Sequence, residues 1–312
     1  MDFHHISCMP DEVLAFLQGK EKGIYVDATL GGCGHSRRIL TEVPESHLIG
    51  IDQDPYAIAH AKEALAPYGN RVTLVHGNFS GIGSILNDLG ISAVDGILAD
   101  LGLSLYQLEA SGRGFSFKGD EPLDMRMDPA SPRSAADIVN QEKEQTLKTL
   151  FRDLGEERFA GPIARRIVHA REENPIEKTG QLAEIVRMCI PAKHRAKQKI
   201  HPATRVFMAL RIAVNEELEK LDFFLKEAPL RLLPGGKMVV LSFHSLEDRR
   251  VKQAFRKLAF PCTCPPDFPL CNCGGRADFR LLTSKAVKPG EKEILANPMA
   301  RSTRLRALQR LP

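Results

Sequence analysis

Short apolar, β-branched runs alternate with amphipathic segments through the first hundred residues of the chain. Runs of this kind predict buried strands, and apolar residues that recur at three- and four-residue steps predict helices. The pattern predicts helices near residues 35–43, 56–66 and 80–89, and strands at Ile24–Thr29, His47–Asp52, Arg71–His76 and Val94–Ala99. Such a βαβαβαβ series implies an α/β fold, in which helices cover both faces of a parallel sheet.

The alternation stops at Tyr106, and from there to His201 the chain is charged and helix-like. An amphipathic helix then begins at Pro202, with one apolar stripe made of Phe207, Leu210, Val214, Leu218, Leu221 and Leu225. Strand patterns return at Lys237–Phe243, Phe279–Thr283 and Arg304–Leu308, and the last two are candidates to complete the sheet. We therefore predict an α/β domain of residues 1–105 and 202–312, interrupted by a helical insertion at 106–201.

Composition narrows the class of protein. With 312 residues and 43% hydrophobic content, the chain can bury a sizeable core. No apolar run approaches the roughly 18 residues of a membrane helix, and the first residues lack the basic, then apolar, start of a secretory signal. Seven cysteines, an odd number, fit reduced thiols better than a secreted disulfide framework. We expect a soluble, cytoplasmic protein.

A glycine-rich loop, "DATLGGCGHS" at residues 27–36, follows the first predicted strand. Open parallel sheets bind ligands at this edge, and the glycines allow close backbone approach. Two familiar loops do not fit: the third glycine of G-x-G-x-x-G is replaced by Arg37, and no Gly-Lys-Ser/Thr follows. A purely structural turn remains open. Cys33 and His35 are a weak candidate nucleophile and base, because residues two apart in a turn need not face each other.

Polar side chains also end the later strands. Asp52 ends the second strand, where a carboxylate can accept hydrogen bonds from both hydroxyls of a ribose. Together with Asp27 and the glycines it favours an adenosine-bearing cofactor without pyrophosphate, of which S-adenosylmethionine is the common one. Phe79, after the third strand, is a candidate for an adenine face, with core packing as the alternative. Asp100 ends the fourth strand, and a carboxylate there needs a partner.

Seven ordered blocks carry a resemblance to a known family: "DATLGGCGHS", "GIDQDPYAI", "RGFSFKGDEPLDMRMD", "GEERFAGPIARRIV", "HPATRVFMALRIAVNEEL", "SFHSLEDRRVK" and "NPMARSTRLR". The chain resembles the RsmH (MraW) family of bacterial 16S ribosomal RNA cytosine-N4 methyltransferases over nearly its whole length. The resemblance implies a class I S-adenosylmethionine-dependent methyltransferase fold, Rossmann-like and mostly parallel, with an inserted helical domain. The cofactor contacts it implies are Cys33, Gly34, His35, Asp52, Phe79, Asp100 and Gln107. At Cys33 we expect the backbone, rather than the thiol, to matter.

Methylating the exocyclic amine of cytosine is difficult because the nitrogen lone pair is delocalised into the ring. A group must accept its hydrogen bond while the methyl is held in line, and Asp100 is the candidate acceptor. Many amino-directed methyltransferases carry Asn/Asp-Pro-Pro-Tyr/Phe here, whereas this chain has Asp-Leu-Gly-Leu, so their mechanism does not transfer as a whole. Methylation of ring carbon 5 needs a cysteine nucleophile, and "ADLGLS" offers none.

Two regions are candidates for RNA contact. Between Ile185 and Asn215 the chain has no acidic residue and seven basic ones: Arg187, Lys193, Arg195, Lys197, Lys199, Arg205 and Arg211. Such a run suits phosphate contacts, with a solvated loop as the alternative, and we expect the insertion to recognise RNA. The block "SFHSLEDR" predicts a substrate pocket at Ser242, Phe243 and His244, or helix capping. A hydrolase triad with Asp248 is disfavoured because the nucleophile elbow is missing.

Cys262, Cys264, Cys271 and Cys273 form two C-x-C pairs, close enough for one tetrahedral zinc ion. Zinc pairs are more often spaced C-x-x-C, and some members of the resembled family lack the cluster. We therefore expect reduced thiols and no metal, with a structural zinc as the alternative.

The expected partners are 16S ribosomal RNA or the small ribosomal subunit, with no membrane and with a homodimer left open. Two rival functions remain at this stage. A non-catalytic RNA-binding ribosome-assembly factor would explain the basic run but not the cofactor residues. A nicotinamide-dependent oxidoreductase is disfavoured by the missing third glycine.

Overall fold

The computed structural model describes residues 7–17, 22–196, 200–262, 264, 273 and 275–312. The chain divides into two compact units, one made of Met1–Gly102 and Leu218–Pro312 and the other of Leu103–Glu217. Within the described parts of both, no helix combines the length and apolar character that crossing a membrane requires.

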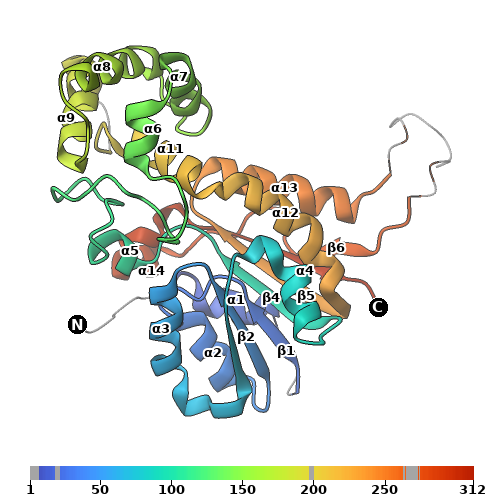
Figure 1. Cartoon of the computed structure of the whole chain (residues 1–312). Helices are drawn as coiled ribbons and strands as arrows, with labels where there is room; N and C mark the ends of the chain where they lie inside the picture. Colours follow the sequence, from blue (N-terminus) through green and yellow to red (C-terminus); the bar gives the residue numbers. More distant parts are fainter. Residues whose placement is uncertain (1–6, 18–21, 197–199, 263, 265–272, 274) are drawn as a thin grey trace. The chain divides into compact units, whose positions relative to one another are not determined.

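The first unit is built on a seven-stranded sheet in the order β3-β2-β1-β4-β5-β7-β6 (Figure 1). Strands β1 to β5 pair in parallel, and β7 runs antiparallel between β5 and β6. Their bounds are β1 Ile24–Asp27, β2 His47–Asp52, β3 Val72–His76, β4 Val94–Asp100, β5 Leu232–Ser242, β6 Phe279–Leu281 and β7 Arg304–Arg310. All seven predicted strands are confirmed, although β5 starts at Leu232 rather than at Lys237.

Helices cover both faces of this sheet, as the strand and helix alternation predicts. One face packs against α4, α12 and α13, and the other against α1, α2 and α3. Because side chains alternate along a strand, Val26 and Ile97 join the first core and their neighbours Tyr25 and Leu98 the second. The helix bounds are α1 Pro10–Leu17, α2 Gly34–Glu42, α3 Pro55–Ala64, α4 Ile82–Asp88, α12 Glu217–Glu227, α13 Ser245–Ala259 and α14 Glu291–Ala296.

Helix α3 shows how local sequence sets these elements. Asp54 caps it, since its carboxylate accepts a hydrogen bond of 3.1 Å from the backbone N–H of Tyr56, and Pro55 takes the first helical position. Short 3₁₀ segments complete the unit, at Ala66–Arg71, Phe79–Gly81, Ala228–Arg231 and Pro298–Ser302.

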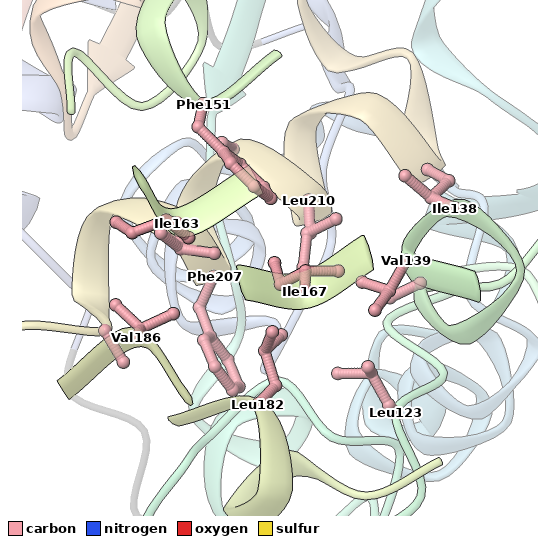
Figure 2. Packing of buried hydrophobic residues seen from close by; sticks show 14 of the residues in the cluster. Leu123, Ile138, Val139, Phe151, Ile163, Ile167, Leu182, Val186, Phe207 and Leu210 are labelled. Atoms are coloured by element: carbon pink, nitrogen blue, oxygen red, sulfur yellow. The ribbon is translucent and has the colours of Figure 1, made fainter. Parts of the chain in front are cut away.

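The second unit is helical and has its own core. Its helices are α5 Leu105–Glu109, α6 Ala135–Gln141, α7 Glu144–Asp153, α8 Ala160–Glu173, α9 Thr179–Cys189, α10 Ala192–Arg195 and α11 Thr204–Asn215. Apolar side chains from α6 to α9 and α11 fill this core, and Figure 2 shows Phe151, Ile167 and Leu210 pointing into it. The predicted interruption of the α/β domain by a helical segment therefore corresponds to a separate packed unit.

The predicted helix that begins at Pro202 and continues to Leu225 is wrong. Glu216 adopts a left-handed backbone, with φ of 52°, and divides it into α11 and α12. The apolar stripe divides with it: the core of the helical unit includes Phe207, Leu210 and Val214, and the core of the sheet includes Leu221 and Leu225. The helical unit consequently ends at Glu217 and not at residue 201, where the sequence analysis placed the boundary.

Candidate active site

The loop after β1 reverses direction over a few residues and then enters α2. Gly31 has φ of 45°, and Cys33 has φ of 61° and ψ of 16°, immediately before the first helical residue, Gly34. Positive φ is easy for glycine and costs energy for residues with a Cβ. Two backbone hydrogen bonds fix the turn: the N–H of Cys33 donates to Leu30, and the carbonyl of Cys33 accepts from Arg37. The backbone of the loop is therefore fixed at the carboxyl edge of the sheet.

Asp27, the last residue of β1, is buried beneath this loop. Its carboxylate accepts hydrogen bonds from the Ser36 hydroxyl at 2.6 Å and from the Thr29 backbone N–H at 3.2 Å. Burial raises the pKa of Asp27 to about 6, and the Ser36 hydrogen bond opposes part of that rise. Asp27 thus joins the strand end to the start of α2, so that both ends of the glycine loop are anchored.

Asp52, the last residue of β2, holds the same loop from the other side. One carboxylate oxygen accepts from the backbone N–H of Gly31 at 2.9 Å, and the other accepts from Asp54 at 2.9 Å. Burial raises the pKa of Asp52 to about 6, while these two backbone hydrogen bonds lower it. Each carboxylate oxygen can accept more than one hydrogen bond, so Asp52 keeps the capacity to bind two hydroxyl groups.

The thiol of Cys33 is fully buried, and burial raises its pKa to about 12. The negative charges of Asp27 and Asp52 contribute to this rise. A thiol in this state is almost entirely protonated near neutral pH and is a poor nucleophile. Cys33 therefore contributes a backbone conformation to the loop rather than a reactive sulfur.

Asp100, the last residue of β4, forms an ion pair with His35, the second residue of α2; His35 is buried and Asp100 is half-buried. His35 Nε2 lies 3.5 Å from Asp100 Oδ2, which is longer than a good hydrogen bond. The backbone N–H of Asp100 donates to the Thr29 hydroxyl at 2.7 Å, which fixes the strand end. Asp100 Oδ1 and His35 Nε2 are both buried and have no hydrogen-bond partner among the described residues. A buried acceptor in this state costs free energy unless a ligand binds it.

The charge state of His35 follows from the same neighbours. Burial lowers the pKa of His35, but its interaction with Asp100 and the charge of Asp27 outweigh burial, so the pKa lies above the ordinary value. The protonated imidazolium is consequently favoured beside Asp100. This interaction engages Oδ2 and leaves Oδ1 as the open acceptor of the carboxylate.

Phe79 follows β3 and is half-buried. Its ring meets Phe224 of α12 edge to face, with centroids 5.2 Å apart, and packs against the core on that side of the sheet. Core packing, one of the two alternatives from sequence, therefore accounts for part of the ring. Its contact with an adenine stays a prediction.

The segment after Asp100 runs close to the end of β5. Gly102 has φ of 97°, and a methyl group on it would lie 3.3 Å from Cδ2 of Phe243. Ser242 ends β5 beside β4, and its hydroxyl is buried without a hydrogen-bond partner among the described residues. Ser242 and Phe243 are therefore brought to the sheet edge that holds Asp100.

His244 and Asp248 have structural partners. His244 caps α13, because its Nδ1 accepts from the backbone N–H of Glu247 while Glu247 accepts from Phe243. The Asp248 carboxylate binds the Arg306 guanidinium at 2.7 and 3.2 Å. Capping, the alternative role from sequence, is thus present at His244, and a triad of Ser242, His244 and Asp248 is not formed. Substrate binding by His244 stays a prediction.

Gln107 belongs to the helical unit. Its side chain accepts a hydrogen bond from the backbone N–H of Ser104, whose hydroxyl accepts from Gln107, so the two residues cap α5. Gln107 is buried, and its contact with a cofactor stays a prediction.

Acidic residues that lie outside the basic run pair with several of its arginines and partly neutralise its charge. Arg187 pairs with Glu184 and Arg211 with Glu217, each through two hydrogen bonds, and Arg205 lies 4.0 Å from Glu157. Lys193 is exposed and Arg195 is half-buried at α10, whereas Lys197 and Lys199 lie outside the described residues. Among the described members, Lys193 and Arg195 remain the best candidates for phosphate contact.

Sequence reasoning missed the roles of Thr29 and Ser36. Both stand in the quoted glycine loop, yet hydroxyls at those positions carry no spacing signal of their own. Their importance comes from Asp27 and Asp100, which the fold brings within hydrogen-bond distance.

A sheet in this order, with β7 antiparallel, and a cofactor-type loop after β1 define a class I S-adenosylmethionine-dependent methyltransferase. Residues 2–311 match the model of the MraW methylase family, and the chain belongs to this family. A relative named "Ribosomal RNA small subunit methyltransferase H" in Desulfosudis oleivorans is 55% identical over 312 residues, covering all of both chains. Relatives of the same name in Geobacter sp. strain M21 and Geobacter sulfurreducens are each 50% identical, covering 99% and 100% of both chains respectively.

Proposed function

We propose that this protein transfers a methyl group from S-adenosylmethionine to the exocyclic N4 of a decoding-centre cytidine in 16S ribosomal RNA. The observation that carries the proposal is Asp100 Oδ1, a buried acceptor with no hydrogen-bond partner among the described residues. It lies at the carboxyl edge of β4, where sheets of this type bind ligands. Membership of a methylase family and the names of the relatives support the reaction class and the small-subunit RNA substrate.

The residues of the glycine loop fit the cofactor. Asp52 has the acceptor capacity for two ribose hydroxyls and is held by the N–H of Gly31. The fixed backbone at Cys33 and Gly34 allows the rest of the cofactor, beyond its ribose, to approach the loop closely. Phe79, which follows β3, is proposed to offer a ring face to the adenine. When bound, the cofactor supplies an electrophilic methyl group on a positively charged sulfur.

Asp100 compensates for the weak nucleophilicity of the exocyclic amine by accepting a hydrogen bond from it. In the reaction the amino nitrogen would bond to the methyl carbon, the electron pair of the broken sulfur–carbon bond would stay on sulfur, and one of the two amine protons would pass through Asp100 Oδ1 to solvent. Asp100 Oδ1 accepts a hydrogen bond from the amino group and stabilises the positive charge that grows on nitrogen as it attacks. His35 holds Oδ2 in the ion pair, so it is a positioning residue that keeps Oδ1 directed to the substrate.

The two buried thiols of this unit, Cys8 and Cys33, favour nitrogen over ring carbon as the methyl acceptor. Methylation at carbon 5 of cytosine requires a cysteine thiolate to add to the ring. Burial raises the pKa of Cys33 to about 12 and that of Cys8 to about 11, so both are held as neutral thiols. Asp100 needs no such covalent step.

The helical unit is proposed to contact RNA through Lys193 and Arg195 on α10, with Lys197, Lys199 and Arg205 as further phosphate contacts. Ser242 and His244 are proposed to contact the substrate from the sheet unit. A cytoplasmic location follows from a ribosomal substrate. The homodimer stays a prediction, which light scattering on the purified protein checks.

Transfer of labelled methyl from S-adenosylmethionine to small ribosomal subunits that lack the modification tests the proposal. We expect label in 16S RNA, and calorimetry should show cofactor binding without RNA. Cofactor binding with no transfer to either subunits or free RNA would favour the alternative of a non-catalytic assembly factor.

Substitution Asp100→Asn tests the role of the carboxylate. Because the amide is neutral and cannot stabilise growing positive charge as well, we expect turnover at saturating donor and RNA to fall about 100-fold or more. Asp88→Asn, at the exposed end of α4, is the matched control and should keep normal turnover. Full turnover of Asp100→Asn under saturating conditions would contradict the mechanism.

A further inference from the structure

Three cysteines lie together in the segment that joins α13 to β6, and none of them has a role in the proposed reaction. The sulfur atoms of Cys262, Cys264 and Cys273 all lie within 4.8 Å of one another. The sulfurs of Cys262 and Cys273 are 3.6 Å apart, although the two cysteines stand eleven positions apart in the chain. The fold therefore gathers thiols from both ends of this segment at one point.

Their spacing matches a metal site better than a disulfide. Thiolates on a tetrahedral zinc ion, with Zn–S bonds of ~2.3 Å, lie about 3.8 Å from each other. A disulfide brings its sulfurs to about 2.05 Å. The 3.6 Å between Cys262 and Cys273 corresponds to the first arrangement, and the outer limit of 4.8 Å leaves only small adjustments for an ion to make.

The backbone independently brings the two ends of the segment together. A methyl group on Gly275 would lie 3.1 Å from the carbonyl carbon and oxygen of Pro261 and 3.2 Å from the nitrogen of Cys262. Only a residue without a Cβ fits easily at this approach. The chain thus places Cys273 beside Cys262 through packed backbone, so that part of the ordering cost of a metal site is met by the fold itself.

The ligand type selects the ion. Thiolates favour zinc, copper(I) and iron–sulfur clusters over magnesium or calcium, and a compact tetrahedral thiolate set without redox partners is typical of structural zinc. Cys262 and Cys273 are exposed and Cys264 is half-exposed, so an ion can reach them from solvent. Cys271 lies outside the described residues, and a further ligand or water completes the four positions.

We propose that Cys262, Cys264 and Cys273 bind one structural zinc ion that ties the end of α13 to the segment leading into β6. This assigns a metal to thiols that the sequence analysis expected to be reduced and metal-free. The ion would restrict the connection between a helix that covers the sheet and its edge strand. Because none of these cysteines takes part in the proposed reaction, the role of the ion is structural and does not depend on that reaction.

Metal content of the full-length protein tests the proposal. The protein should be purified without a histidine tag, with a thiol reductant and no added metal, and analysed by plasma mass spectrometry. We expect one zinc ion per chain in the wild type. Cys262→Ser and Cys273→Ser should lose it, whereas Cys189→Ser, a half-buried thiol of the helical unit, should retain it.

A second measurement covers variants that fail to fold. In the wild type, a strong chelator should lower the melting temperature and expose these three cysteines to alkylation, and added zinc should reverse both effects. Cobalt in place of zinc should give intense thiolate-to-metal absorption. Zinc-free wild-type protein, equal zinc in Cys262→Ser and Cys189→Ser, or a Cys262–Cys273 disulfide in protein purified without reductant would each overturn the proposal.

Discussion

At the scale of single residues, buried carboxylates with raised pKa values make the site sensitive to pH. Asp52 has a pKa of about 6 because burial outweighs the hydrogen bonds that it accepts from Gly31 and Asp54. Raised in this way, it stabilises the free protein below its unfolded pKa of ~3.9, and that stabilisation is lost as pH rises through about 6. Ribose hydroxyls donate hydrogen bonds to the ionised carboxylate of Asp52. Cofactor binding should therefore strengthen, rather than weaken, as pH rises through about 6.

We therefore expect affinity for S-adenosylhomocysteine, the demethylated cofactor, to rise between ~pH 5 and ~pH 7 and then to level off. Calorimetry across this range measures it. Asp52→Asn should weaken binding and flatten the profile, while Asp88→Asn should behave as wild type. Asp27 also has a pKa of about 6, but its carboxylate is engaged by Ser36 and Thr29. A profile of unchanged steepness in Asp52→Asn would show that another group controls binding.

Cys33 provides a test of backbone against thiol. With φ of 61° the position favours glycine, and a β-branched residue there is strained by about 1–2 kcal/mol. We expect Cys33→Gly to keep turnover within about twofold, and Cys33→Val to have the lower melting temperature of the two. Valine replaces the buried volume of the thiol better than glycine does. A site governed by packing would therefore give the reverse order of stability, and a catalytic thiol would make both variants inactive.

At the scale of elements, much of the fold could be predicted because the apolar periodicity is strong where strands are buried on both faces. The break between α11 and α12 at Glu216 could not be predicted. Their apolar stripe continues at helical spacing through Glu216, a residue without the glycine signal of a helix end, and only tertiary packing divides it. The pairing of Arg187 with Glu184 was also missed, since counting charge inside the basic run leaves out the acid just before it.

Asn215, at the end of α11, shows how such an element is anchored. Its buried amide accepts from the backbone N–H of Met127 and donates to the carbonyl of Met125, both at 2.8 Å. Met125 has φ of 61°, so the side chain fixes an irregular loop to the helix. Sequence alone gave no reason to single out this asparagine, because its partners lie far away in the chain.

Asn215→Ala leaves a buried donor and a buried acceptor without partners and should lower the free energy of unfolding by about 2–4 kcal/mol. Urea denaturation measures the change. Asn174→Ala, at the exposed end of α8, is the matched control and should change stability by less than about 0.5 kcal/mol. Equal stability of the two variants would mean that water or a shifted backbone replaces the buried amide.

At the scale of the whole molecule, the sheet unit collects the proposed chemistry from residues that are distant in sequence. Asp27, Asp52 and Asp100 end β1, β2 and β4, which are neighbours in the sheet. This convergence could be predicted, since the carboxyl ends of parallel strands meet at one edge. The sequence could not predict which oxygen of Asp100 stays open, because this depends on how His35 and Thr29 lie around the strand end.

The identity of the methylated nucleoside tests the central claim most directly. Small ribosomal subunits that lack the modification should be incubated with the wild-type protein and S-adenosylmethionine, and their 16S RNA digested to nucleosides for chromatography and mass spectrometry. The account predicts N4-methylcytidine, which Asp100→Asn should form far more slowly. Recovery of 5-methylcytidine, or of a methylated nucleoside other than cytidine, would contradict it.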